Sequence, residues 1–324
     1  MSKKLRDYVP ALKYGAKITS EDTVGIGSFD GMFETNVWYV DGDNGSDDDQ
    51  GGFSTPYAKI QTAIDAAGAL DTIYIKALAP TGDVSDPNQY EEDLTIAFAK
   101  HGLKMIGVGS GGAGLPFFGP KIKNATATAL LTVNASGVHI EGLQFNCSQN
   151  SGTYGVYLTG VTGYATLAGS VGATVKNCYI KNASATYGGI SVYGGYASVI
   201  HGCTFGLGTD CLAINLDCDT LPNNSHTIEY CNFKSNNGAS VALHASLENS
   251  KDFNLDHCNF DQATKFITVV DGATGMISNS TFNSGSTAVV ANSTGKIEIP
   301  AACDEVGVAG CWGGDGTAVD ASGD

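Results

Sequence analysis

The chain has 324 residues, a formal net charge of −16, 15% charged residues and 43 glycines. This acidity excludes nucleic acid and anionic membrane as partners of the main body, because both would be repelled, and no apolar run is long enough to span a membrane. Hydrophobic residues make up 42%, so a sizeable core is possible, and the low charge with abundant glycine is typical of strands and turns.

Residues 1–36 are predicted to form an extended N-terminal arm. Its first 17 residues carry five basic side chains against one acid, and its apolar residues keep neither a helical nor a strand period. One interpretation is a solvated basic tail. The alternative is an anchor whose basic side chains meet an acidic partner. The anchoring residues would be Lys3, Lys4, Arg6, Tyr8, Leu12, Lys13, Tyr14 and Lys17.

An acidic, glycine-containing loop follows at residues 41–49. Carboxylates at spaced positions suit Ca²⁺, which takes roughly six to eight oxygen ligands. The candidate ligands are Asp41, Asp43, Asp47 and Asp49. Gly52 stands where an EF-hand loop would end in glutamate, so an acidic loop without metal is the other interpretation.

A capping helix is predicted near residues 55–67. Thr55 would be its N-cap and Pro56 its first helical residue, and apolar side chains recur at helical spacing up to Ala67. Gly68 would end the helix. We expect it to cover the N-terminal end of a stack of strands, because an open end is an exposed edge.

Six segments between residues 138 and 282 repeat one pattern at steps of roughly 22–35 residues. Each contains an aliphatic, a small and a large position. The aliphatic column is Ile140, Val175, Ile200, Ile228, Leu255 and Ile277; the small column is Leu143, Cys178, Cys203, Cys231, Cys258 and Ser280; the large column is Phe145, Ile180, Phe205, Phe233, Phe260 and Phe282.

Strand residues two apart share a face, so the small and large columns would both point inward, after a bend that follows the aliphatic residue. Each repeat holds a second strand as well. The pattern predicts an all-β fold, a right-handed single-stranded parallel β-helix of about ten rungs over residues 37–295, followed by a Gly/Asp-rich tail at 296–324. The nine cysteines, an odd number, are expected to be reduced thiols in a chain without a secretory signal.

The opening of the body, residues 38–47 and 71–75 with the helix between them, resembles that of pectin-lyase-like β-helix proteins. That family includes polysaccharide lyases, hydrolases, adhesins and phage virion proteins, so the resemblance implies architecture rather than activity. Residues 6–18 resemble N-terminal segments of structural proteins of marine tailed phages.

Residues 208–214 resemble the Gly-Asp-Asp-Cys-Ile-Ala-Ile stretch of polygalacturonase-type hydrolases, which need paired carboxylates. Thr209 replaces the first aspartate, so Asp210 is the one catalytic candidate. The body also lacks arginine, which makes a basic groove for a uronate polymer hard to build. Further aspartates near the rungs either line a sugar groove or form a solvated face: Asp217, Asp219, Asp252, Asp256 and Asp261.

The sequence therefore favours a non-enzymatic phage virion structural protein, a capsid decoration or head-fibre subunit held by its arm. The resemblance implies a homotrimer located in the virion and assembled in the host cytoplasm, with the capsid or other virion proteins as partners. No cofactor is expected beyond the calcium considered above. The alternative is a tailspike-like β-helix that binds or depolymerises polysaccharide.

Overall fold

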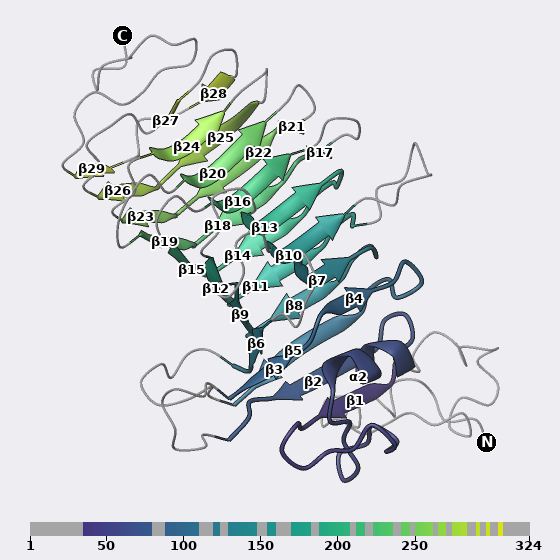
Figure 1. The fold of residues 1–324 in the computed structure, drawn as a ribbon. Helices are drawn as coiled ribbons and strands as arrows, with labels where there is room; N and C mark the ends of the chain where they lie inside the picture. The colour runs from purple at the N-terminus through teal and green to yellow at the C-terminus, as the bar shows by residue number, and fades with distance from the viewer. Residues whose placement is uncertain are drawn as a thin grey trace, which may run out of the picture. The chain divides into compact units, whose positions relative to one another are not determined.

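The structure is a computed structural model that describes residues 35–79, 88–109, 119–123, 129–147, 154–159, 170–182, 188–207, 212–217, 223–235, 241–246, 250–261, 265–269, 274–283, 290–291, 296–298 and 304–306. Residues 37–324 form one compact unit, separate from residues 1–36. Within this unit the chain winds repeatedly through three parallel sheets, so that each rung lies on the one before (Figure 1). The predicted parallel β-helix is confirmed.

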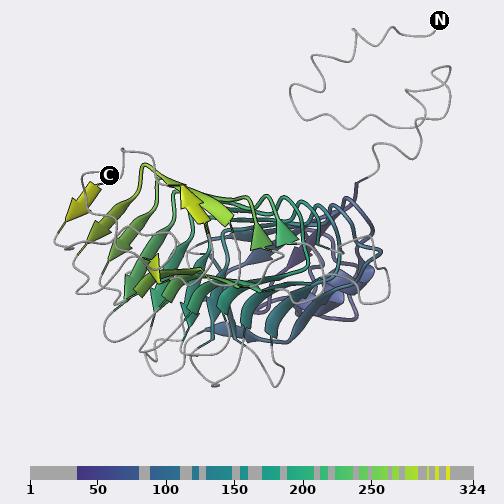
Figure 2. The same cartoon turned by 90° about the horizontal axis from the view of Figure 1, so that it is seen from above.

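From β2 onward, and apart from β17 and β21, successive strands belong to the ten-, nine- and eight-stranded sheets in turn; Figure 2 shows the stack from another side. The ten-stranded sheet consists of β1 (Val37–Val40), β2 (Thr72–Lys76), β5 (Lys104–Val108), β8 (His139–Glu141), β11 (Thr174–Lys176), β14 (Val199–His201), β18 (Thr227–Glu229), β22 (Phe253–Asp256), β25 (Thr274–Ser278) and β28 (Lys296–Glu298).

The nine-stranded sheet consists of β3 (Gln89–Glu91), β6 (Lys121–Lys123), β9 (Gln144–Asn146), β12 (Tyr179–Asn182), β15 (Thr204–Leu207), β19 (Asn232–Ser235), β23 (Asn259–Asp261), β26 (Thr281–Asn283) and β29 (Asp304–Val306). The eight-stranded sheet consists of β4 (Leu94–Ile96), β7 (Ala129–Val133), β10 (Tyr154–Thr159), β13 (Gly188–Tyr193), β16 (Leu212–Asp217), β20 (Val241–Ser246), β24 (Lys265–Val269) and β27 (Val290–Ala291). A small extra pair joins β17 (Asn223–Asn224) and β21 (Ser250–Lys251).

The stack continues beyond its predicted end at residue 295. β28 pairs with β25, and β29 pairs with β26, both in parallel. The segment at 296–324 was expected to be a tail because of its glycine and aspartate content. Two short strands within it nevertheless extend the ten- and nine-stranded sheets, because an existing strand edge offers hydrogen-bonding groups to almost any sequence.

The predicted columns are in register inside the stack. Phe205, Phe233 and Phe260 occupy paired positions, with ring centroids 4.9 and 4.7 Å apart and nearly parallel planes. The aliphatic column is likewise aligned from Ile140 to Ile277, and its members are buried. Phe282 pairs with Phe260 in the strand register, and its side chain lies outside the described residues.

The predicted bend between the aliphatic and small columns is a corner built on one left-handed residue per rung. These residues have φ between 46° and 69° and are Gly142, Asn177, Gly202, Tyr230, His257 and Asn279. Glycine adopts this conformation readily, and asparagine and histidine adopt it more often than other side chains, whereas tyrosine does so rarely. The corner lets the chain turn from the ten-stranded to the nine-stranded sheet within two residues.

The capping helix is shorter than predicted, and Thr55 is not its N-cap. Helix α2 spans Ile60–Ala66, and its N-cap Lys59 makes no side-chain capping bond. The carboxylate of Glu92 takes that role, since its two oxygens accept the backbone N–H groups of Ile60 and Gln61, each at 2.9 Å. The start of the helix is thus fixed by a residue from a later turn of the chain. Its buried face contacts β1, β2 and β4 at the N-terminal end of the stack, as expected.

Candidate functional site

Three histidine–carboxylate pairs lie on the outer face of the ten-stranded sheet and its corner. His139 Nε2 lies 2.9 Å from Glu141 Oε2, and His201 Nδ1 lies 2.9 Å from Glu229 Oε1. His257 Nδ1 lies 2.8 Å from Asp256 Oδ2. We name these six residues the acid–histidine ladder.

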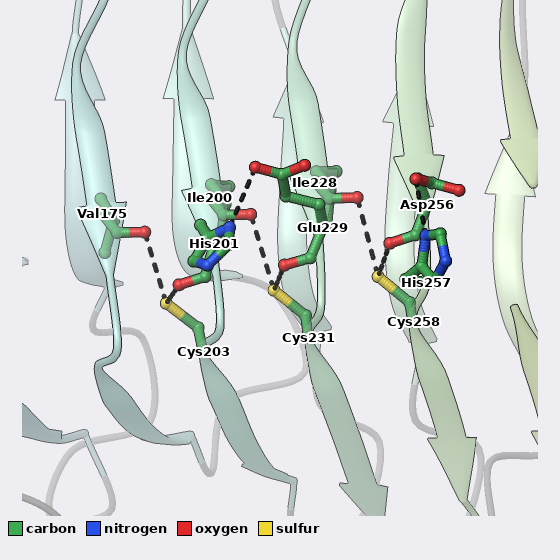
Figure 3. Close-up of polar contacts among 10 residues, drawn as sticks. All are labelled: Val175, Ile200, His201, Cys203, Ile228, Glu229, Cys231, Asp256, His257 and Cys258. Atoms are coloured by element: carbon green, nitrogen blue, oxygen red, sulfur yellow. Dashed lines mark hydrogen bonds and ion pairs between the residues drawn. The ribbon is translucent and has the colours of Figure 1, made fainter. Parts of the chain in front are cut away.

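Strand alternation explains why these side chains point outward. In β8, β14, β18 and β22 a buried aliphatic residue precedes a half-buried polar one, which therefore lies on the opposite face. His201 and Glu229 occupy paired positions on neighbouring strands, so their pair bridges two rungs. Figure 3 shows His201 reaching across to Glu229 and His257 beside Asp256.

An exposed aromatic ring stands within the ladder. Tyr230 is a left-handed corner residue whose side chain is 50% exposed. Its ring stacks on the imidazole of His257, with centroids 4.9 Å apart and planes 21° from parallel. On the other side, the His201 ring lies 5.4 Å away. The imidazole rings of His201 and His257 therefore both contact the Tyr230 ring, each from a neighbouring rung.

Hydrogen bonds hold two of the ladder carboxylates in the ionised form. Slight burial acts to raise the pKa of Asp256, but bonds from Ser278 Oγ (2.7 Å), Asn279 Nδ2 (2.9 Å) and His257 lower it overall. The hydrogen bond from His139 is the main cause that lowers the pKa of Glu141. Both groups are therefore hydrogen-bond acceptors at neutral pH.

The cysteine column lies directly beneath this face. Each thiol donates to a main-chain carbonyl of the preceding rung: Cys203 to Val175, Cys231 to Ile200 and Cys258 to Ile228, at 3.5–3.7 Å (Figure 3). Burial raises the pKa of the Cys178, Cys203 and Cys231 thiols, so they stay protonated. The interpretation of these cysteines as small buried side chains is confirmed.

The acidic loop uses its aspartates for internal contacts. Asp41 forms an ion pair with Lys76 at 2.6 Å, and Asp47 forms one with Lys59 at 3.2 Å. Asp43 accepts the backbone N–H of Ala79. Among the described residues no group of three or more potential ligands could hold a metal ion, and the role of calcium stays a prediction.

Several other predicted site residues lie outside the described residues. These are Asp210, Asp219 and all the anchoring residues of the arm, from Lys3 to Lys17. Of the aspartates considered for a sugar groove, Asp256 belongs to the ladder. Asp252 lies at the opposite, N-terminal end of β22, and Asp261 lies on the nine-stranded sheet.

The sequence analysis missed most of the ladder. Glu141, His201, Glu229 and Asp256 each follow an aliphatic column residue, and this recurring polar position was a signal in the aligned repeats. The sequence gives no comparable signal for Tyr230, because its contact with His257 depends on the backbone conformation of the corner.

The family and structural comparisons agree with this architecture. The family model described as "Right handed beta helix region" matches residues 108–299, more than half of the chain. No curated protein sequence matches the chain. Among the described residues no helix has the length and apolar character that a membrane crossing requires.

The fold is similar to that of the pectin methylesterase from Aspergillus niger, with a TM-score of 0.56 and 14% identity over 89% of this chain and 92% of that one. Pectin methylesterase PemA from Erwinia chrysanthemi matches with a TM-score of 0.47 and 12% identity over 80% of each chain. A rhamnogalacturonan lyase matches with a TM-score of 0.45 and 13% identity over 78% of this chain and 75% of that one. At these identities the likeness shows the fold alone.

The expectation of a non-enzymatic protein is wrong. It rested on the absence of a recognised catalytic motif, yet a pectin methylesterase, which is an enzyme, has the same architecture. Missing motifs therefore do not separate this chain from enzymes of the same architecture.

Proposed function

Because the chain belongs to the right-handed β-helix family, we propose that it recognises a polysaccharide on the outer face of its ten-stranded sheet, at the acid–histidine ladder. The observation that carries this proposal is the half-exposed ring of Tyr230, which stacks on His257 between ionisable groups. A pectin methylesterase, an enzyme named for a polysaccharide, uses the same architecture.

The chemistry of the ladder suits a sugar. The exposed half of the Tyr230 ring offers apolar contact to the C–H groups of a pyranose. The carboxylates of Glu229 and Asp256 accept hydrogen bonds from hydroxyl groups, and charge-assisted bonds of this kind are the stronger ones. Glu229 precedes Tyr230 in the chain, and Asp256 precedes its stacking partner His257, so one sugar unit at the ring would lie near two acceptors.

The spacing of the rungs also suits a polymer. Paired residues of neighbouring strands lie about 4.8 Å apart, a distance similar to the length of one sugar unit in an extended chain. Repeated polar positions on successive rungs can therefore contact successive units of one polysaccharide.

Affinity electrophoresis tests the proposal. The native protein is run through gels that contain hydroxyethylcellulose, dextran or galactomannan. The wild type is expected to be retarded by at least one of them. Tyr230→Asn removes the ring and keeps a residue type that occupies the same corner at positions 177 and 279. It should raise the dissociation constant by about tenfold, a loss of about 1.4 kcal/mol.

Phe98→Ala provides the matched control. Phe98 is 53% exposed and follows β4 of a different sheet, so this variant removes an exposed ring away from the ladder. Its retardation should equal that of the wild type. Equal retardation of wild type and Tyr230→Asn in every gel would contradict the proposal.

A second candidate function is cleavage of the bound polysaccharide. Glu229 and Asp256 occupy paired positions on adjacent rungs, and hydrolysis uses two carboxyl groups that flank a glycosidic bond. Asp256, held ionised, would remove a proton from the attacking water. Glu229, in its protonated form, would give its proton to the leaving oxygen. Release of reducing ends from the same three polymers is the measurement, and Asp256→Asn should lower it at least about hundredfold.

The virion setting is a further proposal, supported by the basic arm and the resemblance of residues 6–18 to phage structural proteins. A homotrimer attached through residues 1–36 would present several ladders at once. Sedimentation equilibrium of the full chain should then give three times the monomer mass. A monomer over the micromolar range would remove the trimer from this proposal.

A further inference from the structure

One column of residues runs along the outer face of the ten-stranded sheet from β1 to β25. Each member pairs with the next in the strand register, and their flanking neighbours in β1 and β2 point into the stack. The column consists of Tyr39, Tyr74, Ile106, Glu141, Lys176, His201, Glu229, Asp256 and Ser278. The acid–histidine ladder is therefore one part of a longer surface.

The N-terminal end of this column is aromatic. Tyr39 stacks on Tyr74 with ring centroids 5.8 Å apart, and Phe53 meets Tyr39 edge-on at 5.3 Å. Phe53 is 83% exposed, the most exposed of the large apolar side chains that the structure describes. We name Tyr39, Phe53 and Tyr74 the aromatic cluster. It presents ring surface on the outer face of the ten-stranded sheet, and Tyr230 stands at the corner that borders this sheet.

We infer that a single polysaccharide chain lies parallel to the solenoid axis and contacts the aromatic cluster at one end and Tyr230 at the other. This inference rests on the proposed polysaccharide recognition and adds the direction, length and charge class of the ligand. Tyr74 lies on the second strand of the sheet, and Glu229, which precedes Tyr230, lies on the seventh. Five strand spacings of about 4.8 Å separate them, or about 24 Å in all.

This span sets the length of the ligand. A chain of about five or six sugar units is needed to reach both ends, whereas a trisaccharide reaches only one. Joining two contacts in one ligand makes the second contact intramolecular, so affinity rises steeply once the span is reached.

The charges along the column favour a neutral polymer. Between the two ends Glu141 and Lys176 carry opposite charges on adjacent rungs, and the carboxylate of Glu229 follows two rungs later. A uronate polymer would need a positive field along the column, which this alternation does not provide. The net charge of −16 would repel such a polymer at long range.

Calorimetry with matched trisaccharides and hexasaccharides of the cello-, isomalto- and manno-series tests the inference. In the series that binds, the hexasaccharide should bind at least about tenfold more tightly than the trisaccharide. Phe53→Ala and Tyr230→Asn should each remove most of this difference. Phe98→Ala should keep it, because Phe98 lies off the column.

The outcomes separate this inference from the proposed function. If Tyr230→Asn weakens binding while Phe53→Ala leaves the hexasaccharide unchanged, the axial arrangement is wrong and recognition at the ladder stands. If neither variant weakens binding to any of the neutral polymers, the axial arrangement and the proposed recognition at the ladder are both wrong. If polygalacturonate retards the protein more than all three neutral polymers, the assignment of a neutral ligand is overturned.

Discussion

The ring of Phe253 fills the space beside Gly275, its partner on the next strand. A Cβ built on Gly275 would lie 2.4 Å from Cζ of that ring, closer than real atoms approach. The glycine is needed here for space, because one rung carries a phenylalanine in a column where earlier rungs carry smaller residues such as Ala173 and Ser198.

Gly275→Ala should therefore destabilise the protein by about 1–3 kcal/mol through overpacking. Urea unfolding followed by circular dichroism measures the change. Gly68→Ala serves as control, since the nearest atom to its Cβ would lie at an ordinary 3.5 Å. Similar unfolding midpoints for Gly275→Ala and the wild type would show that the Phe253 ring moves aside at little cost.

Phe233→Ala should cost about 3–5 kcal/mol of unfolding free energy. The Phe233 ring is buried and stacks between those of Phe205 and Phe260, so its removal leaves a cavity and deprives both neighbouring rings of their stacking partner. Thermal or urea unfolding gives the value, and Phe98→Ala is the exposed counterpart. A loss below about 1 kcal/mol would mean that the rungs collapse to refill the column.

Stability should fall as the pH is lowered from 6.5 towards 4, in part because of His226. Burial lowers the pKa of His226 to about 4, and its Nδ1 accepts the Ser198 N–H at 3.3 Å. The unfolded chain binds a proton near pH 6.5 and the folded chain does not, so stability present above pH 6.5 is lost as the pH falls through this window. The shift corresponds to about 3 kcal/mol.

Urea unfolding at a series of pH values checks this contribution. His226→Leu should be less sensitive to pH between 6.5 and 4 than the wild type. Parallel pH profiles for the two proteins would mean that His226 is protonated in the folded state at its ordinary pKa.

The thiols of the cysteine column should resist alkylation in the folded protein. Within the part of the chain that the structure describes, five cysteines are buried and not in disulfides: Cys147, Cys178, Cys203, Cys231 and Cys258. Burial raises the pKa of at least three of these thiols, and the thiolate is the reactive form. Peptide mass spectrometry after iodoacetamide treatment should find them unmodified in buffer and modified in urea. Rapid native modification of Cys203 or Cys231 would contradict the buried column.

The stack could be predicted because its signal is repeated. Ile140, Phe145 and their counterparts recur in the same order, and each rung pairs with neighbours that carry the same pattern. The start of α2 could not be predicted in this way. Thr55 and Pro56 look like a local helix start, but the groups that need capping are satisfied by Glu92, more than 30 residues later.

The candidate site was harder to find for a related reason. His201 and Glu229 are 28 residues apart, and a single polar residue after each aliphatic one is what a solvated strand face also presents. They become neighbours only because β14 and β18 pair in a register that places His201 beside Glu229. The contact of Tyr230 with His257 depends further on a left-handed backbone conformation at both residues, which tyrosine in particular adopts rarely.

The left-handed corners also bear on how such a protein changes its length in evolution. Val199 and Thr227 occupy equivalent positions, and residues 197 and 225 just before them share the same left-handed conformation. After a tandem gene duplication of residues 199–226, residue 226 would be followed by residue 199, which is equivalent to its normal successor, residue 227. The duplication would thus add one complete turn, since each turn bonds only to its two neighbours. The outer column would grow by one step of about 4.8 Å, so the length of this exposed face can change in whole rungs without a redesign of the core.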